Sequence, residues 1–117
     1  MPKKFIRGVK YAGQGAKHAL QTERNIWLHF IIGLLVFGLG IMLKVSQIEL
    51  VIIVLTITLV IVAEMFNTAF EEMVDLIKPE NHPTAALVKN VAAGAVLTAA
   101  IGAALIGLLI LIPKLIR

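Results

Sequence analysis

Four polar residues in the middle of the chain have the types and the spacing to do chemistry together. They follow one another at intervals of three, four and four residues: Glu64, Asn67, Glu71 and Asp75. On a helix, at about 100° per residue, their side chains fall within an arc of about 80°, so they form a single polar stripe. Glu72 lies off this stripe, and a solvated helix end is enough to explain both Glu72 and Glu80.

A solvated helix end does not explain Glu64, because this residue directly follows an uncharged, strongly apolar run from Leu50 to Ala63. If the helix enters hydrocarbon near Leu50, a span of about 20 residues ends near Ala69. Glu64 then lies roughly 8 Å inside the membrane edge. A charged residue in the apolar zone costs about 2.5–3.5 kcal/mol on insertion scales and usually marks function. We therefore expect Glu64 to be a functional residue.

The residue types around the polar stripe are those of a phosphoryl-transfer site. A carboxylate in a low-dielectric environment can act as a general base near neutral pH. Carboxylates one or two turns further along, close to water, can hold Mg²⁺, which prefers oxygen ligands and commonly arrives with nucleotide phosphates. Lys89 could neutralise phosphate at the same membrane face. Other polar residues expected at this edge are Glu23, Asn25, Asn81 and His82.

Composition places these residues in an integral membrane protein, because 59% of the 117 residues are hydrophobic, too many for a small soluble domain. The chain has no cysteine, which excludes disulfides and cysteine metal sites. We expect an all-α membrane protein of one domain. The single integral membrane domain covers 1–117. Within it we predict an amphipathic surface helix over 1–24 and transmembrane helices over 26–43, 48–77 and 85–112.

Local signals mark the ends of these helices. Ser46, with Glu49 three residues later, predicts a capping box at the start of the second transmembrane helix. Pro79 and Pro83 are expected to end that helix, and Pro113 to stop the third, because proline cannot continue a regular helical hydrogen-bond ladder.

The basic residues predict the orientation in the membrane. Eight of the eleven fall on the side of the N-terminus and the 78–89 loop: Lys3, Lys4, Arg7, Lys10, Lys17, Arg24, Lys78 and Lys89. This bias predicts a multi-pass membrane protein whose N-terminus and 78–89 loop lie in the cytoplasm. Because the positive charge flanks hydrophobic segments, we expect no nucleic-acid partner.

A row of small residues runs along the third transmembrane segment at four-residue spacing: Ala95, Ala99, Ala103 and Gly107. Small residues in one row let helix backbones approach closely in lipid. We interpret the row as a packing seam.

The chain resembles the small bacterial membrane lipid kinases, the diacylglycerol kinase and undecaprenol kinase family. The family signature E-x-x-N-[ST]-[AS]-x-E-x-x-x-D stands here as EMFNTAFEEMVD, and VKNVAAGAVL follows where the family has Lys-Asp ahead of a small-residue helix. The upstream ERNIWLH is similar to the family's ERN…H segment. The resemblance covers nearly the whole chain. It implies ATP-dependent phosphorylation of a lipid alcohol, undecaprenol or diacylglycerol, with Mg²⁺, by a homotrimer with sites at subunit interfaces. It also implies a location in the bacterial inner (cytoplasmic) membrane.

Matched position by position, the resemblance makes Glu64 the catalytic base and Lys89 the phosphate-contacting lysine. Glu71 and Glu23 correspond to the pair that holds the metal of Mg-ATP. The remaining implied residues are Asn67 and Asp75 as polar supports, and Tyr11, Glu80, Asn81, His82 and Asn90 around the nucleotide.

The sequence departs from the family pattern at two positions. Asn90 stands where the family usually has Asp, which removes a negative charge beside the nucleotide. Trp27 stands where a basic residue is common.

Two other functions fit parts of the sequence. A small proton- or ion-handling membrane subunit would use Glu64 as a relay, but would not need a polar stripe that opens beside a lysine. A purely structural membrane protein assembled through the small-residue row would need neither a buried Glu64 nor the polar stripe. ATP consumption that depends on an added lipid alcohol separates the kinase from both alternatives.

Overall fold

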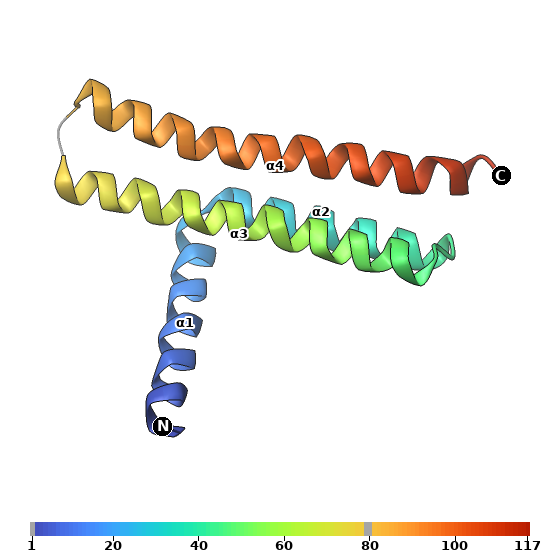
Figure 1. Ribbon diagram of the computed structural model, residues 1–117, viewed down its shortest axis with the longest axis horizontal. Coiled ribbons are helices and arrows are strands. Elements are labelled where there is room, and N and C mark those ends of the chain that lie inside the picture. The colour runs from blue at the N-terminus through green and yellow to red at the C-terminus, as the bar shows by residue number, and fades with distance from the viewer. Residues whose placement is uncertain (1, 79–80) are drawn as a thin grey trace.

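The computed structural model describes residues 2–78 and 81–117. This part of the chain forms four helices: α1 (Pro2–Thr22), α2 (Arg24–Met42), α3 (Gln47–Ile77) and α4 (Pro83–Leu115) (Figure 1). The all-α class is as predicted. α2, α3 and α4 are each long and apolar enough to cross a membrane.

The long helices run side by side, with α3 packed against both α2 and α4. α1 leaves this bundle crosswise from the start of α2, and both α3 and α4 extend beyond the level at which α1 joins (Figure 1). The C-terminus lies at the opposite end of the bundle from the α3–α4 connection, near the α2–α3 turn (Figure 1).

The α2–α3 turn carries the predicted capping box. The Ser46 hydroxyl accepts from the backbone N–H of Glu49 at 3.1 Å, and the Glu49 carboxylate accepts from the backbone N–H of Ser46 at 2.8 Å. The end of α4 is tied to the same turn, because Arg117 donates to the carbonyl of Leu43 at 2.7 Å and Lys114 pairs with Glu49 at 3.4 Å. These contacts fix one end of the bundle.

Two glycines set the approach of α2 to α3. A Cβ atom added at Gly33 would lie 2.7 Å from Cγ2 of Ile57, and one added at Gly40 would lie 3.3 Å from Cδ1 of Ile53. Ile53 is itself part of the small buried core. The close approach of α2 to α3 at this point therefore requires a residue without a side chain at position 33.

The third transmembrane helix differs from the prediction at both ends. It was expected over 85–112 but extends from Pro83 to Leu115, and Pro113 lies within it instead of stopping it. Proline removes a single backbone donor, and its fixed φ is compatible with helix. Pro113 lies only two residues before the end of α4, so only the last turn has to adapt to its ring. At the other end, Pro83 occupies the first turn, where its missing N–H costs nothing.

The small-residue row is not a close packing seam within this chain. A Cβ atom added at Gly107 would meet nothing within 4 Å, and Ala95 is exposed. Ala103 and Gly107 instead line a cavity of about 570 Å³ between α2, α3 and α4. Small side chains here leave space open where the prediction had backbones in contact.

Candidate active site

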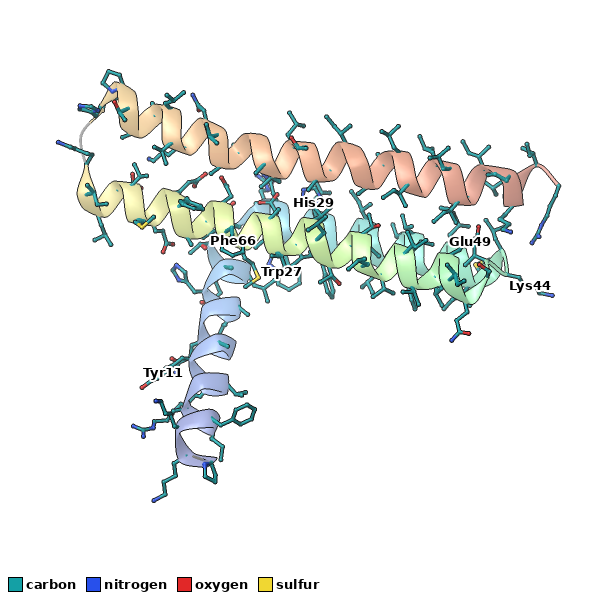
Figure 2. The ribbon with its side chains drawn as sticks, viewed as in Figure 1. Tyr11, Trp27, His29, Lys44, Glu49 and Phe66 are labelled. Atoms are coloured by element: carbon teal, nitrogen blue, oxygen red, sulfur yellow. The ribbon has the colours of Figure 1, made fainter. Side chains whose placement is uncertain are left out.

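Glu64 lies on α3 and is almost completely buried, with 1% of its surface exposed. Its Oε1 lies 3.1 Å from Nε2 of His29, which projects from α2 (Figure 2). Most of the large side chains around the long helices are exposed hydrophobics. A buried carboxylate with a titratable partner in such a chain is costly unless it has a function.

One turn further along α3, Asn67 is also buried. Its amide nitrogen donates to Oε1 of Glu71 at 3.1 Å, while the Thr68 hydroxyl donates to the backbone carbonyl of Glu64 at 3.1 Å. The amide oxygen of Asn67 is buried and has no hydrogen-bond partner among the described residues. A buried acceptor without a donor is expensive, so this oxygen is a place where a cation or a ligand donor would be stabilised.

Glu23 stands at the break between α1 and α2, in extended conformation. Its side chain does not cap α2. Both Glu23 and Glu71 lie within electrostatic range of Glu64. The structure therefore brings the predicted base and the predicted metal pair into one acidic group.

Two carboxylates and an amide oxygen near Glu64 have the chemistry of Mg²⁺ ligands. Among the described residues, no three or more His, Cys, Asp or Glu side chains come together in a way that could hold a metal ion by themselves. Mg²⁺ does not need such a cluster, since it commonly binds through one or two carboxylates together with water and substrate phosphates. Glu23, Glu71 and the unpaired Asn67 oxygen offer oxygen atoms only, which fits Mg²⁺.

The end of the polar stripe is linked to α4. Nζ of Lys89 lies 2.6 Å from Oδ1 of Asp75, and both side chains are partly exposed. Asp75 is eleven residues beyond Glu64, or about 16 Å along the helix axis. The structure thus places Lys89 beside the stripe, but well away from Glu64.

Two side-chain contacts hold α1 to the bundle. The indole N–H of Trp27 donates to the carbonyl of Leu20 at 2.6 Å, across the α1–α2 junction. His18 pairs with Glu72 of α3. Trp27 therefore has a structural contact of its own in place of the basic residue common in the family, and Glu72 is more than a solvated helix end.

The other predicted nucleotide residues are not gathered around Glu64 in this chain. Tyr11 is 65% exposed and lies on α1, outside the bundle of long helices (Figure 2). Asn81 and Asn90 are exposed. The His82 ring accepts from the backbone N–H of Thr84 at 3.1 Å and caps α4. Glu80 lies outside the described residues.

His29 is the site residue that the sequence analysis did not assign. It stands within the ERNIWLH segment, but no role was attached to it. The signal was available, because His29 is the one titratable residue between 26 and 43, and an ionisable residue inside a span is a functional candidate by default. His29 also lines the cavity between the long helices.

Comparisons with known proteins show the family of this chain. A family model described as prokaryotic diacylglycerol kinase matches residues 10–111. Undecaprenol kinase of Bacillus subtilis (strain 168) is 40% identical over 112 residues, which cover 96% of this chain and 91% of the relative. A diacylglycerol kinase of Synechocystis sp. is 38% identical over 113 residues, 96% of this chain and 65% of the relative.

A diacylglycerol kinase of Haemophilus influenzae is more distant, at 28% identity over 86 residues. The family match spans most of the chain and both ends of the polar stripe. The chain belongs to the prokaryotic diacylglycerol kinase family and is a lipid kinase.

Proposed function

We propose that this protein transfers the γ-phosphoryl group of ATP to the hydroxyl of undecaprenol at the cytoplasmic face of the bacterial inner membrane. The observation that carries the proposal is the burial of Glu64 beside His29, in an apolar helix, at the start of a stripe that holds two further carboxylates. Undecaprenol is preferred to diacylglycerol because the match to the undecaprenol kinase covers 91% of that relative, whereas the match to the Synechocystis diacylglycerol kinase covers 65% of its length.

Glu64 acts as the general base in this proposal. The lipid hydroxyl loses its proton to the Glu64 carboxylate while its oxygen attacks the γ-phosphorus and ADP departs. Burial keeps water from competing for the phosphoryl group, and the two helices hold the carboxylate in place. Catalysis then consists mainly of positioning and electrostatic stabilisation.

Glu23 and Glu71 would hold Mg²⁺, with the buried Asn67 oxygen beside them. Bound Mg²⁺ would supply charge neutralisation of the nucleotide phosphates. Asn67 has a defined task on this chain, because its amide nitrogen fixes the Glu71 carboxylate.

Lys89 would neutralise phosphate, with Asp75 holding its ammonium group in place. The nucleotide would also contact Tyr11, Glu80, Asn81, His82 and Asn90. These residues come from α1, from the α3–α4 connection and from α4. A nucleotide that met all of them would need more than one copy of the chain, which is the main support for a homotrimer with shared sites.

The proposal is tested by giving the purified protein γ-labelled ATP together with one lipid alcohol at a time. Undecaprenol should yield a labelled lipid phosphate, with a kcat/KM higher than that for diacylglycerol. Faster labelling of diacylglycerol would overturn the choice of acceptor. ATP hydrolysis that does not depend on any added lipid alcohol would overturn the assigned reaction.

A further inference from the structure

We propose that His29 is a positioning and proton-accepting residue of this kinase: its Nε2 holds the Glu64 carboxylate and receives the proton that Glu64 takes from the lipid hydroxyl. The proposal rests on the proposed function of Glu64 as base. The observation behind it is that two titratable side chains from different helices lie together, with Nε2 of His29 3.1 Å from Oε1 of Glu64.

The difference in exposure between the two side chains indicates that the proton passes from Glu64 to His29 and from there out of the protein. The Glu64 side chain is 2% exposed, whereas that of His29 is 22% exposed. A buried carboxylate that gains a proton in each turnover must lose it before the next. Because Glu64 has almost no contact with the surroundings of the protein, the proton must leave through a neighbouring group.

No other described neighbour of Glu64 is suited to take this proton. The Thr68 hydroxyl is engaged with the backbone carbonyl of Glu64, and the Asn67 amide is neutral and bound to Glu71. The charged groups within range, Glu23 before α2 and Glu71 on α3, are assigned to the metal. The part of α4 that faces His29 across the cavity is uncharged, with Ala100, Ala103 and Ala104 among its lining residues.

The cavity explains why a lipid hydroxyl would arrive at this pair. Its lining is apolar except for His29 and Thr56, and the Thr56 hydroxyl already donates to the carbonyl of Ile52 at 2.7 Å. His29 is therefore the polar group that lies between this apolar cavity and the carboxylate of Glu64. A lipid alcohol with its chain in the cavity would present its hydroxyl beside the imidazole.

The step balances as follows. The O–H bond of the alcohol breaks as the new P–O bond forms, and the bond from the γ-phosphorus to the bridging oxygen of ADP breaks. Oε1 of Glu64 receives the proton and passes it to the unprotonated Nε2 of His29, whose ring carries its hydrogen on Nδ1 at the start. The resulting imidazolium donates from Nε2 to the regenerated carboxylate and releases the Nδ1 proton, and proton exchange with water then returns His29 to its starting tautomer. The products are the lipid phosphate, ADP and one proton.

The test compares wild-type protein with His29→Gln, Glu64→Gln and His29→Ala, each as the full chain in lipid bilayers. Glutamine can still contact Glu64 but cannot take a proton. We expect His29→Gln to lower kcat at least tenfold, less than the roughly 10²–10⁴-fold effect of a general acid or base itself, while the KM for ATP stays within twofold. The acidic limb of its kcat–pH profile should become less steep, because one of two groups that must be unprotonated has been removed.

Chemical rescue separates this role from a merely structural one. Imidazole added to His29→Ala should restore part of kcat, whereas pyrrole, which has a similar size but is not a base, should not. His18→Gln, which changes the histidine paired with Glu72 on the surface, should keep the wild-type pH profile. A His29→Gln variant with wild-type kcat and pH profile would overturn the proposal.

Loss of activity in both His29 variants without imidazole rescue and without a change in the pH profile would also overturn it, since only a structural role would remain. A different result would show that the proposed kinase function itself is wrong. Wild-type protein would then phosphorylate no lipid alcohol, or Glu64→Gln would remain as active as wild type.

Discussion

Glu64 and Glu71 lie seven residues apart on one face of α3, yet their surroundings differ. Glu64 is buried against an imidazole, whereas Glu71 is only partly buried and one of its oxygens accepts from Asn67. A buried carboxylate beside a proton acceptor suits base catalysis. A carboxylate that is nearer to water and fixed by an amide suits a metal. We therefore propose two roles for the same residue type, because its position along the stripe differs.

Glu64→Gln should lower phosphorylation of the lipid at least a hundredfold, because glutamine keeps the size and polarity of the side chain but cannot accept the proton. Transfer of label from ATP to lipid measures this loss. The helical circular dichroism of the variant should match that of wild type, which shows that the fold is kept. Turnover close to wild type would remove Glu64 from the mechanism.

Glu71→Gln should raise the Mg²⁺ concentration needed for half-maximal activity at least fivefold and leave the lipid KM nearly unchanged, because the residue is assigned to the metal. Glu23→Gln should behave in the same way. Glu72→Gln is the matched control, since Glu72 is the next residue on α3 but lies off the polar stripe. Equal Mg²⁺ titrations for Glu71→Gln and Glu72→Gln would place the metal elsewhere.

Asn90→Asp restores the residue that the family usually has. A hydrogen bond to a charged group is worth about 1.5–3 kcal/mol, against about 1 kcal/mol for a neutral one. We therefore expect kcat/KM for ATP to rise roughly tenfold, which corresponds to about 1.4 kcal/mol. Steady-state kinetics with varied ATP measure this change. A decrease would mean that Asn90 is tuned to its neighbours and that an added charge repels the triphosphate.

Among the elements, the contact between α2 and α3 matters most for the site, because it places His29 against Glu64. Gly33 and Ile57 come into this contact four residues after His29 and seven before Glu64. A close contact here fixes the distance between the two helices. The close contact at Gly33 therefore lies one to two helical turns from the Glu64–His29 pair.

Gly33→Ala should destabilise the protein by about 1–3 kcal/mol, the usual cost of overpacking, since Ile57 must move to admit the new methyl group. Gly38→Ala is the matched control on the same helix, because its added Cβ meets nothing within 4 Å. Alanine is favoured over glycine in a helix by about 1 kcal/mol, so the control should be unchanged or more stable. Unfolding in sodium dodecyl sulphate, followed by circular dichroism, compares the two. Equal stabilities would contradict the close contact.

The helices and the polar stripe could be predicted because both depend on patterns within one segment. Long apolar runs specify helices in a membrane, and the three- and four-residue spacing puts Glu64, Asn67 and Glu71 on one face. His29 was not assigned because its meaning depends on a partner in another helix. The row from Ala95 to Gly107 depends on a partner in the same way: within one chain Ala103 and Gly107 line a cavity, and a seam between chains stays a prediction. Pro113 was wrongly expected to stop α4, because a proline close to the end of a helix disturbs only its last turn.

At the scale of the whole molecule, a single chain does not bring all the assigned residues together. Lys89 is held at Asp75, about 16 Å along α3 from Glu64, and Tyr11 lies outside the bundle (Figure 2). The proposed homotrimer would supply the missing groups, with Lys89 or Tyr11 of one chain completing the site of another. The exposed apolar surface of the long helices would lie partly against neighbouring chains and partly against lipid.

Shared sites have a consequence that mixing experiments detect. Glu64→Gln and Lys89→Ala should each be inactive alone, because one lacks the base and the other the phosphate contact. If a site takes these residues from different chains, assembly of the two variants together should restore activity, since some sites then contain Glu64 from one chain and Lys89 from another.

Cross-linking in bilayers should show dimers and trimers in the same samples. Two variants mixed after separate assembly in bilayers are the control and should stay inactive. A mixed sample that forms trimers without any activity would mean that each chain supplies both residues to its own site, and an active protein that remains strictly monomeric would exclude the shared site altogether.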